Sequence, residues 1–492
     1  MQDTTQLGLD PHNWPDFRTH AHELLDHVLD FQQNQRDRPA WRAVSPEVEA
    51  LAEQAVPLEG LGDVAVMREM VQHVLPYPPG HAHPRFWGWV CGTGTPIGML
   101  ADLVAAGMNA SAGTFNEAPT RIENQVIRWM LELFDFPSGA SGILTSGASM
   151  ANVIGLAVGR DAILGHSQSQ AGLAGLPKAL VYASDQVHSS VDKAMNLLGL
   201  GRQNLRKIPT DSDYRISLEA LKAAITQDRA NGYRPLALVG NAGTVNTGAI
   251  DDLEGLAAIA QAENLWFHVD GAIGGLAVLS PNLKTRFSGM EKADSIAFDF
   301  HKWMYVPYEA GCVIVRHGDL HRQSFQTAAS YLEAIPRGIA AVEDPANIRG
   351  PQLSRGFKAL KVWAQMRSYG TQKLGQLMEQ NVADVAYLAQ KIQASVQLEL
   401  LAPATLNIVC FRFVSTQLTE TQLDDLNKEI LMRLQESGIA VPSSTRIRGH
   451  FALRVANTNH RTRREDFDVL LAETLNLGNQ LLMEQTQQPV GA

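Results

Sequence analysis

Between Gly142 and Val315, short aliphatic segments alternate with helical segments and glycine-containing loops. This alternation predicts β-α-β units, and therefore an α/β fold with a mostly parallel sheet. Ligands of such sheets bind beyond the carboxyl ends of the strands, so the residues that follow each strand are the first candidates for a functional site. The predicted strands are Ile143 to Thr145, Leu180 to Ala183, Leu236 to Val239, Leu265 to Val269, Ser295 to Phe298 and Cys312 to Val315.

The segments on either side of this region have different patterns. Apolar residues at helical spacing from Phe17 to Leu29 predict an amphipathic helix, and a second helical stretch follows near Val64 to Val74. After Ser354, a long helical region leads to the apolar segment Leu406 to Val414, which is typical of a small α+β domain. We therefore expect an N-terminal helical segment (1–84), a large ligand-binding domain (85–353) and a C-terminal small domain (354–492).

Composition excludes several classes of protein. The formal charge of -10 and the lack of a basic stripe argue against nucleic acid as a partner, and no apolar run approaches the length of a membrane span. Cys91, Cys312 and Cys410 form neither a disulfide framework nor a CxxC motif, so with no secretory signal visible we expect a cytoplasmic protein. His81 and His83 have no third ligand at zinc-like spacing, so we expect no metal site.

Two charged residues stand at the ends of predicted strands. Lys302 follows the strand in DSIAFDFHKW, and Asp270 closes the strand in FHVDGAIGG. Alone, a lysine at such a place is usually solvated and an aspartate usually caps a turn or a helix. Together they suit pyridoxal phosphate, which needs a lysine for its aldehyde and a carboxylate for its pyridine nitrogen. The pair therefore predicts a pyridoxal-phosphate enzyme.

Two further motifs are weaker when each is taken alone. In SGILTSGASMAN, a strand runs through a turn of small residues into a helix, so Gly147, Ala148 and Ser149 could bind a phosphate with free backbone amides. An ordinary glycine-containing turn explains that stretch equally well. In VYASDQVHSS, His188 follows another predicted strand and could stack on a flat cofactor, although a lone loop histidine is more often solvated or a helix cap.

Several motifs in one order indicate a family. They are HPRFWGW, MLADLVAAGMNA, APTRIE, SGASMAN, SDQVHSSVDKA, AGTVNTGAIDD, FHVDGAIGG, DSIAFDFHKW and LRVANTNHRT. With them the chain resembles, over nearly its whole length, the group II pyridoxal-phosphate-dependent decarboxylases, which include aromatic amino acid, tyrosine and glutamate decarboxylases. The resemblance implies a type I aminotransferase-like fold. It also implies a homodimer with active sites at the subunit boundary, in which residues 1–84 pack on the partner.

The resemblance also implies roles for single residues. Lys302 would form the Schiff base, Asp270 would pair with the pyridinium, Ala272 would pack under the ring and His188 would stack over it. Around the phosphate and in the neighbouring loop would lie Ala148, Ser149, Asp299, His301 and Thr244. The implied reaction is decarboxylation of an L-amino acid to an amine and CO₂.

The substrate pocket departs from the family pattern. Trp89, Val90, Cys91 and Gly92 stand where the aromatic decarboxylases have aromatic residues followed by Pro-Thr, and Ser111 and Gly113 replace larger apolar residues. A glutamate-type pocket is absent too. The substrate therefore stays open, although the aromatic residues here favour an aromatic or apolar amino acid, with Trp89 and Gly92 as candidate contacts.

The loop expected to supply a proton also departs from the family. In the decarboxylases a tyrosine of this loop returns a proton to Cα, but residues 336–350 (PRGIAAVEDPANIRG) contain none, and Ala346 falls near that position. His188 or a bound water would then supply the proton. We expect amine as the main product, with a share of aldehyde, ammonia and peroxide. Two alternative activities are a decarboxylation-coupled oxidative deamination as the main reaction and a Cα-Cβ cleavage. A third alternative, an inactive scaffold, is the least consistent with the presence of Lys302 and Asp270.

Overall fold

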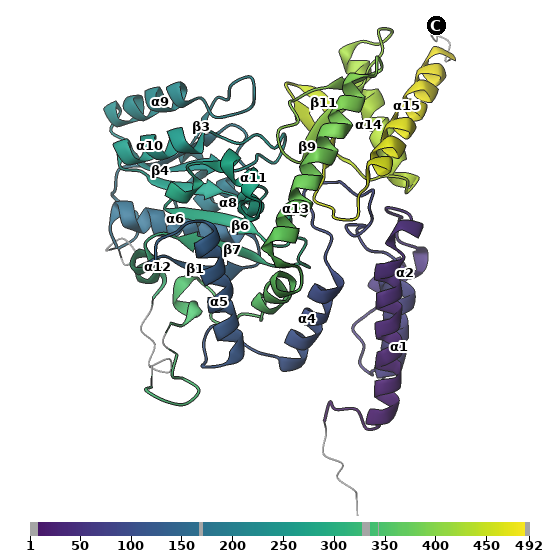
Figure 1. Ribbon diagram of the computed structural model, residues 1–492, viewed down its shortest axis with the longest axis horizontal. Helices are drawn as coiled ribbons and strands as arrows, with labels where there is room; N and C mark the ends of the chain where they lie inside the picture. Colours follow the sequence, from purple (N-terminus) through teal and green to yellow (C-terminus); the bar gives the residue numbers. More distant parts are fainter. Residues whose placement is uncertain (1–7, 167–170, 327–334, 343, 488–492) are drawn as a thin grey trace, which may run out of the picture.

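The computed structural model describes residues 8–166, 171–326, 335–342 and 344–487 of the chain (Figure 1). Its centre is a seven-stranded sheet in the order β1-β7-β6-β5-β4-β2-β3. The strands are β1 (Ser141–Thr145), β2 (Ala179–Ser184), β3 (Leu205–Ile208), β4 (Arg234–Asn241), β5 (Trp266–Asp270), β6 (Ser295–Asp299) and β7 (Gly311–Val315). The predicted α/β fold with a mostly parallel sheet is confirmed, because β3, β2, β4, β5 and β6 pair in parallel.

Two features of the sheet escaped the sequence pattern. Strand β3 is short and lies at the sheet edge, and Arg206 and Lys207 interrupt its apolar residues. Strand β7 runs antiparallel to both β1 and β6. Only residues 300–310 connect β6 to β7, and this is too short for the helical crossover that parallel neighbours require. The same short connection carries Lys302.

Helices cover both faces of the sheet. Leu238 of β4 points into the core formed with α5, α9 and α10, whereas its neighbour Val239 points into the core formed with α6, α8 and α12. The helices of this region are α4 (Pro96–Met108), α5 (Ala118–Leu133), α6 (Ala148–Leu164), α8 (Ser189–Leu197), α9 (Leu218–Ala230), α10 (Leu253–Glu263), α11 (Pro281–Lys284) and α12 (Gly318–Phe325), with short helices η3 (Arg202–Asn204), η4 (Gly275–Leu279), η5 (Thr285–Phe287), η6 (Met290–Lys292) and η8 (Ala346–Arg349).

A second, antiparallel sheet follows towards the C-terminus in the order β10-β11-β9-β8. Helix α13 leads into it from the large sheet and breaks at Gly370, whose φ of 70° favours glycine (Figure 1). The elements are α13 (Ala359–Gln393), β8 (Leu398–Leu400), β9 (Ile408–Phe413), α14 (Glu420–Glu436), β10 (Ser443–Ile447), β11 (His450–Ala456) and α15 (Arg464–Gln487).

The N-terminal helices lie apart from the seven-stranded sheet, next to α4 and the second sheet (Figure 1). None of α1, α2 and α3 contains a buried residue. These elements are α1 (Trp14–Gln33), η1 (Gln35–Asp37), α2 (Pro46–Ala52), α3 (Asp63–Glu69) and the π-helical η2 (Met70–Val74). The three-part division at residues 84 and 353 stays a prediction. Among the helices described, none combines the length and apolar character needed to span a membrane.

Candidate active site

The sheet brings Asp270 and Lys302 to one edge. Asp270 is the last residue of β5, and Lys302 follows the adjacent parallel strand β6 by three residues. Both side chains line a cavity of about 360 Å³. Its other lining residues are Trp89, Val90, His188, Asn241, Gly243, Val245, Asn246, Ala272, Ile273, Ser443, Ser444 and Arg454. The cavity therefore holds the amine and the carboxylate that the sequence singled out.

Lys302 forms an ion pair with Asp299. Its Nζ lies 2.7 Å from Asp299 Oδ2, and Asp299 Oδ1 accepts the backbone N–H of Ala148 at 2.7 Å. Burial disfavours the ammonium, but the carboxylates of Asp299 and Asp270 outweigh it and raise the pKa of Lys302. Asp299 therefore holds the lysine at the edge of the cavity and fixes the start of α6.

Helix α6 begins beside this ion pair. Its N-cap, Gly147, provides no side-chain cap, and Ser149 is exposed in the first turn. A Cβ placed on Gly147 would lie 3.4 Å from His301 Cε1, so the helix start and the imidazole are close neighbours. His301 Nδ1 accepts the N–H of Ala310 at 3.1 Å, and burial lowers the pKa of His301. The neutral ring therefore carries its proton on Nε2.

Asp270 accepts two hydrogen bonds from its own surroundings. Its Oδ1 accepts the N–H of Ala272 at 3.2 Å and its Oδ2 accepts Asn152 Nδ2 at 3.0 Å. His188 is the N-cap of α8, and its Nδ1 accepts the N–H of Ser190 at 3.2 Å. Burial lowers the pKa of His188, with Asp270 acting in the opposite direction. A carboxylate and a neutral imidazole thus face the same cavity.

Six predicted site residues are absent from the lining of the cavity, namely Ala148, Ser149, Asp299 and His301 near the start of α6, and Gly92 and Thr244. A Cβ on Gly92 would approach the carbonyl oxygens of His301 and Lys302 to 2.3 and 2.4 Å, so only glycine fits against the lysine backbone. The hydroxyl of Thr244 turns into its own loop, where it lies 3.0 Å from Thr247 Oγ1. From that loop, Val245 and Asn246 line the cavity instead.

Several residues of the cavity were missed at the sequence level. Arg454 donates to the carbonyls of Trp89 (2.8 Å) and Asn246 (3.2 Å), and Ser443 and Ser444 come from β10 of the second sheet. Arg454 lies within LRVANTNHRT, but no local motif marks Ser443 or Ser444 as site residues. Asn152 could have been identified from the sequence, since it lies four residues after Ala148 within SGASMAN and hence on the same side of α6.

The segment expected to carry the proton donor lies elsewhere in this chain. Ala346 is buried, its N–H donates to the carbonyl of Gly113 at 2.9 Å, and it is absent from the lining of the Lys302 cavity. Outside this segment, Tyr305 is a packing residue, because its hydroxyl donates to buried Asn381 at 2.7 Å. Tyr308 is partly exposed and its ring lies against His301, with 4.4 Å between centroids. Tyr331 lies outside the described residues.

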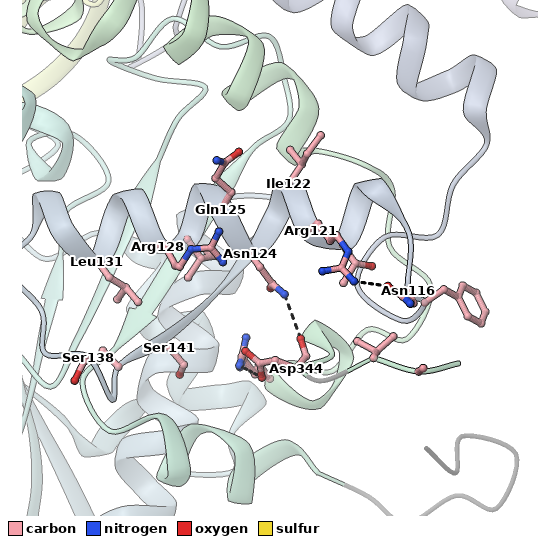
Figure 2. Close-up of a pocket in the computed structure, with 17 residues that line it drawn as sticks. Asn116, Arg121, Ile122, Asn124, Gln125, Arg128, Leu131, Ser138, Ser141 and Asp344 are labelled. Carbon is pink, nitrogen blue, oxygen red and sulfur yellow. Dashed lines mark hydrogen bonds and ion pairs between the residues drawn. The ribbon is translucent and has the colours of Figure 1, made fainter. Parts of the chain in front are cut away.

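A larger cavity of about 680 Å³ lies between α5 and a wall that includes Ala341, Val342, Asp344 and Arg349 (Figure 2). Asn124 on α5 donates to the carbonyl of Asp344 at 3.4 Å across it, and Arg121 donates to Asn116 at 2.7 Å at one end. Neither Lys302 nor Asp270 lines this cavity. Size alone therefore does not identify the active site.

The smaller cavity fits pyridoxal phosphate. It offers an amine for the aldehyde, a buried carboxylate for the ring nitrogen and an imidazole for stacking, on Lys302, Asp270 and His188. Beside the Lys302–Asp299 ion pair lies the N-terminus of α6, whose N-cap Gly147 provides no side-chain cap, and a helix N-terminus suits a phosphate. No cluster of His, Cys, Asp and Glu suited to a metal ion occurs among the residues that the structure describes.

Comparisons with known proteins agree with this chemistry. Residues 47–414 match the family described as pyridoxal-dependent decarboxylase conserved domain. The chain is 30% identical over 476 residues to an aromatic-L-amino-acid decarboxylase of Bacillus atrophaeus, covering 95% of each chain. It is 28% identical to a phenylacetaldehyde synthase of a Rosa hybrid cultivar, covering 91% of this chain and 90% of the other. The crystal structure of Oryza sativa TDC with PLP and tryptamine is 27% identical, with a TM-score of 0.88 over 96% of this chain and 100% of that one.

Proposed function

This chain belongs to the pyridoxal-dependent decarboxylase family and uses pyridoxal phosphate to decarboxylate an amino acid, and we propose that its substrate is an L-amino acid with an aromatic or apolar side chain. The observation that carries the proposal is the cavity at Lys302, where Trp89, Val90 and Ile273 present apolar surface. Its one arginine, Arg454, already donates to three backbone carbonyls and a serine hydroxyl. An acidic side chain would thus find no free cation among the lining residues other than Lys302.

We assign the following roles to the residues of the site. Lys302 carries the cofactor, Asp270 keeps the pyridine nitrogen protonated and His188 packs on the ring. The start of α6, with Ala148 and Ser149, binds the phosphate next to Asp299 and His301. Bound pyridoxal phosphate supplies an electron sink for the electron pair of the broken bond to CO₂.

The protein's own part is orientation and proton control. Asp299 pairs with the Lys302 ammonium at 2.7 Å, so it can hold the amine near the cavity when the lysine is not bound to the cofactor. The cavity walls would orient a bound substrate, and that orientation would decide which of its bonds reacts. His188, with its proton on Nε2, is a lining residue that can deliver a proton inside the cavity.

We further propose a homodimer in the cytoplasm. Helix α4 exposes Leu103 (59%), Val104 (54%) and Met108 (49%), and α1, α2 and α3 contain no buried residue. A second copy that covers these apolar surfaces would explain both observations. The three cysteines are all free thiols, which suits a reducing compartment.

The proposal is tested by CO₂ release. The purified holoenzyme is incubated with each of the common L-amino acids, and Lys302→Ala serves as the matched control. We expect CO₂ and the corresponding amine from aromatic or apolar substrates, and neither product from the variant. Release from glutamate or aspartate alone would contradict the substrate class, and an unreduced rate in Lys302→Ala would contradict the role of the lysine.

A second candidate function is oxidative. No tyrosine or phenylalanine stands in residues 336–350, and relatives of this chain include phenylacetaldehyde synthases. In that reaction the amino acid, O₂ and water yield aldehyde, CO₂, ammonia and hydrogen peroxide. Parallel incubations under air and under nitrogen separate the two activities. We expect a share of aldehyde and peroxide under air only, and equal amine yields in both gases without peroxide would remove the oxidative branch.

A further inference from the structure

We propose that Asn152 is a positioning residue that sets Asp270 and His188 relative to each other, and that His268 in turn fixes the orientation of Asn152. The inference rests on the proposed roles of Asp270 and His188 at the cofactor. Asn152 lies on α6, is fully buried, and is absent from the lining of the cavity. Its contribution would therefore be made entirely through other side chains.

The side-chain amide of Asn152 uses all its main hydrogen-bonding positions. Its two N–H groups donate to Asp270 Oδ2 at 3.0 Å and to Ser190 Oγ at 2.9 Å. Its oxygen lies 2.8 Å from His268 Nε2. Turning the amide over would place its oxygen against the Asp270 carboxylate, so only one orientation satisfies the three neighbours.

His268 completes this arrangement from the other side. Because Asn152 Oδ1 can only accept, His268 must carry its proton on Nε2, and its Nδ1 then accepts the hydroxyl of Ser295 at 2.8 Å. Ser295 Oγ in turn accepts Trp266 Nε1 at 2.8 Å. The ring is completely buried, and burial lowers the pKa of His268 to about 4, so the neutral form with one proton persists at neutral pH.

The second N–H of Asn152 extends the network to His188. Ser190 Oγ accepts that N–H and lies 2.8 Å from His188 Nδ1, which also accepts the backbone N–H of Ser190. Both donors point at Nδ1, so the His188 proton must reside on Nε2. One amide on α6 thus fixes the position of the carboxylate and, through Ser190, the tautomer of the imidazole.

The test measures cofactor affinity, not only turnover. Apo protein is titrated with pyridoxal phosphate, and its dissociation constant is compared for the parent, Asn152→Leu, His268→Leu and His268→Gln. Asn152→Leu should weaken binding by at least about tenfold, the change expected from losing a hydrogen bond to a charged group. His268→Leu should also weaken cofactor binding. His268→Gln can still donate to Asn152 Oδ1, so its dissociation constant should lie nearer that of the parent.

A matched control separates positioning from general destabilisation. Asn427 is a fully buried asparagine of α14 whose side chain bonds, within the described part of the chain, to Phe413 of β9 and Leu423 of its own helix. Asn427→Leu should leave the dissociation constant within about twofold of the parent. A similar loss in Asn427→Leu, or parent-like binding in Asn152→Leu, would overturn the inference.

A second readout works without bound cofactor. ¹⁵N NMR of histidine-labelled apo protein, assigned with His188→Gln and His268→Gln, should show each ring as a single tautomer protonated on Nε2. Ser190→Ala removes the hydroxyl from His188 Nδ1 but keeps the backbone N–H there, so it should shift the ¹⁵N signals of His188 while the proton stays on Nε2. The signals of His268 should stay unchanged, and the variant remains informative if Asn152→Leu does not fold. Nδ1-protonated rings in the parent would overturn the inference even if decarboxylation is confirmed. Conversely, the expected tautomers would sustain the network if no amino acid releases CO₂.

Discussion

Replacing His321 should reduce the loss of stability in mild acid. His321 on α12 is completely buried and connects three segments of the chain. Its Nδ1 lies 2.8 Å from the hydroxyl of Ser141 on β1, and its Nε2 donates to the carbonyl of Arg349 in η8 at 2.7 Å. The neutral ring therefore accepts on one side and donates on the other. A second proton would place a cation in the core, near the Arg349 guanidinium.

The size of the effect follows from the difference in pKa between folded and unfolded chain. Burial lowers the pKa of His321 to about 3, whereas an unfolded histidine titrates near 6.5. Between these values the unfolded chain binds a proton that the folded chain excludes, so the free energy of unfolding falls as the pH falls. From about pH 7.5 to about pH 5, His321 alone should cost about 2 kcal/mol of stability.

Denaturant unfolding of apo protein at these two pH values measures the effect. His321→Gln keeps a donor for the carbonyl of Arg349 and an acceptor for Ser141, and any cost of the substitution itself appears at both pH values. The parent should therefore lose about 2 kcal/mol more than the variant between the two conditions. His22→Gln, on the exposed side of α1, controls for the loss of a histidine as such. Equal pH dependence in the parent and His321→Gln would refute the reasoning.

Three further substitutions have definite expected outcomes. Asp270→Asn should lower kcat by about a hundredfold or more at saturating cofactor, because a neutral amide cannot keep the pyridine nitrogen protonated; near-native turnover would contradict that role. Gly92→Ala should prevent the reduced cofactor adduct from forming on Lys302, as checked by mass spectrometry, because the new Cβ would lie 2.3 Å from a backbone oxygen. In the control Gly107→Ala, where the new Cβ has nothing within 4 Å, the adduct should still be found. Glu123→Gln should lower the free energy of unfolding by about 3–5 kcal/mol in denaturant, because it leaves the buried guanidinium of Arg355 without its carboxylate. A loss below about 1 kcal/mol would argue against this reasoning.

The sequence by itself determined six of the seven strands of the large sheet and the two charged residues at its edge. Parallel strands that are neighbours end on the same side of a sheet, so residues that close β5 and follow β6 had to meet. Asp270 and Lys302 could thus be identified without any contact being known. Hydrophobic patterns reveal this much because they report which residues are buried and where an element ends.

Tertiary structure alone decided which side chains are partners. Lys302 pairs with Asp299 rather than with Asp270, and Arg454 and Ser444 reach the cavity from a sheet formed far along the chain. Asn152 links Asp270 to the α8 cap because α6 lies over β5 and β6 at one particular register. A hydrogen bond forms or fails over a few tenths of an ångström, and such distances depend on how elements remote in sequence pack together. Local residue patterns contain no information at that precision. Asp270 and Lys302, at the ends of strands, were therefore predictable from the sequence, and the hydrogen-bond network around them was not.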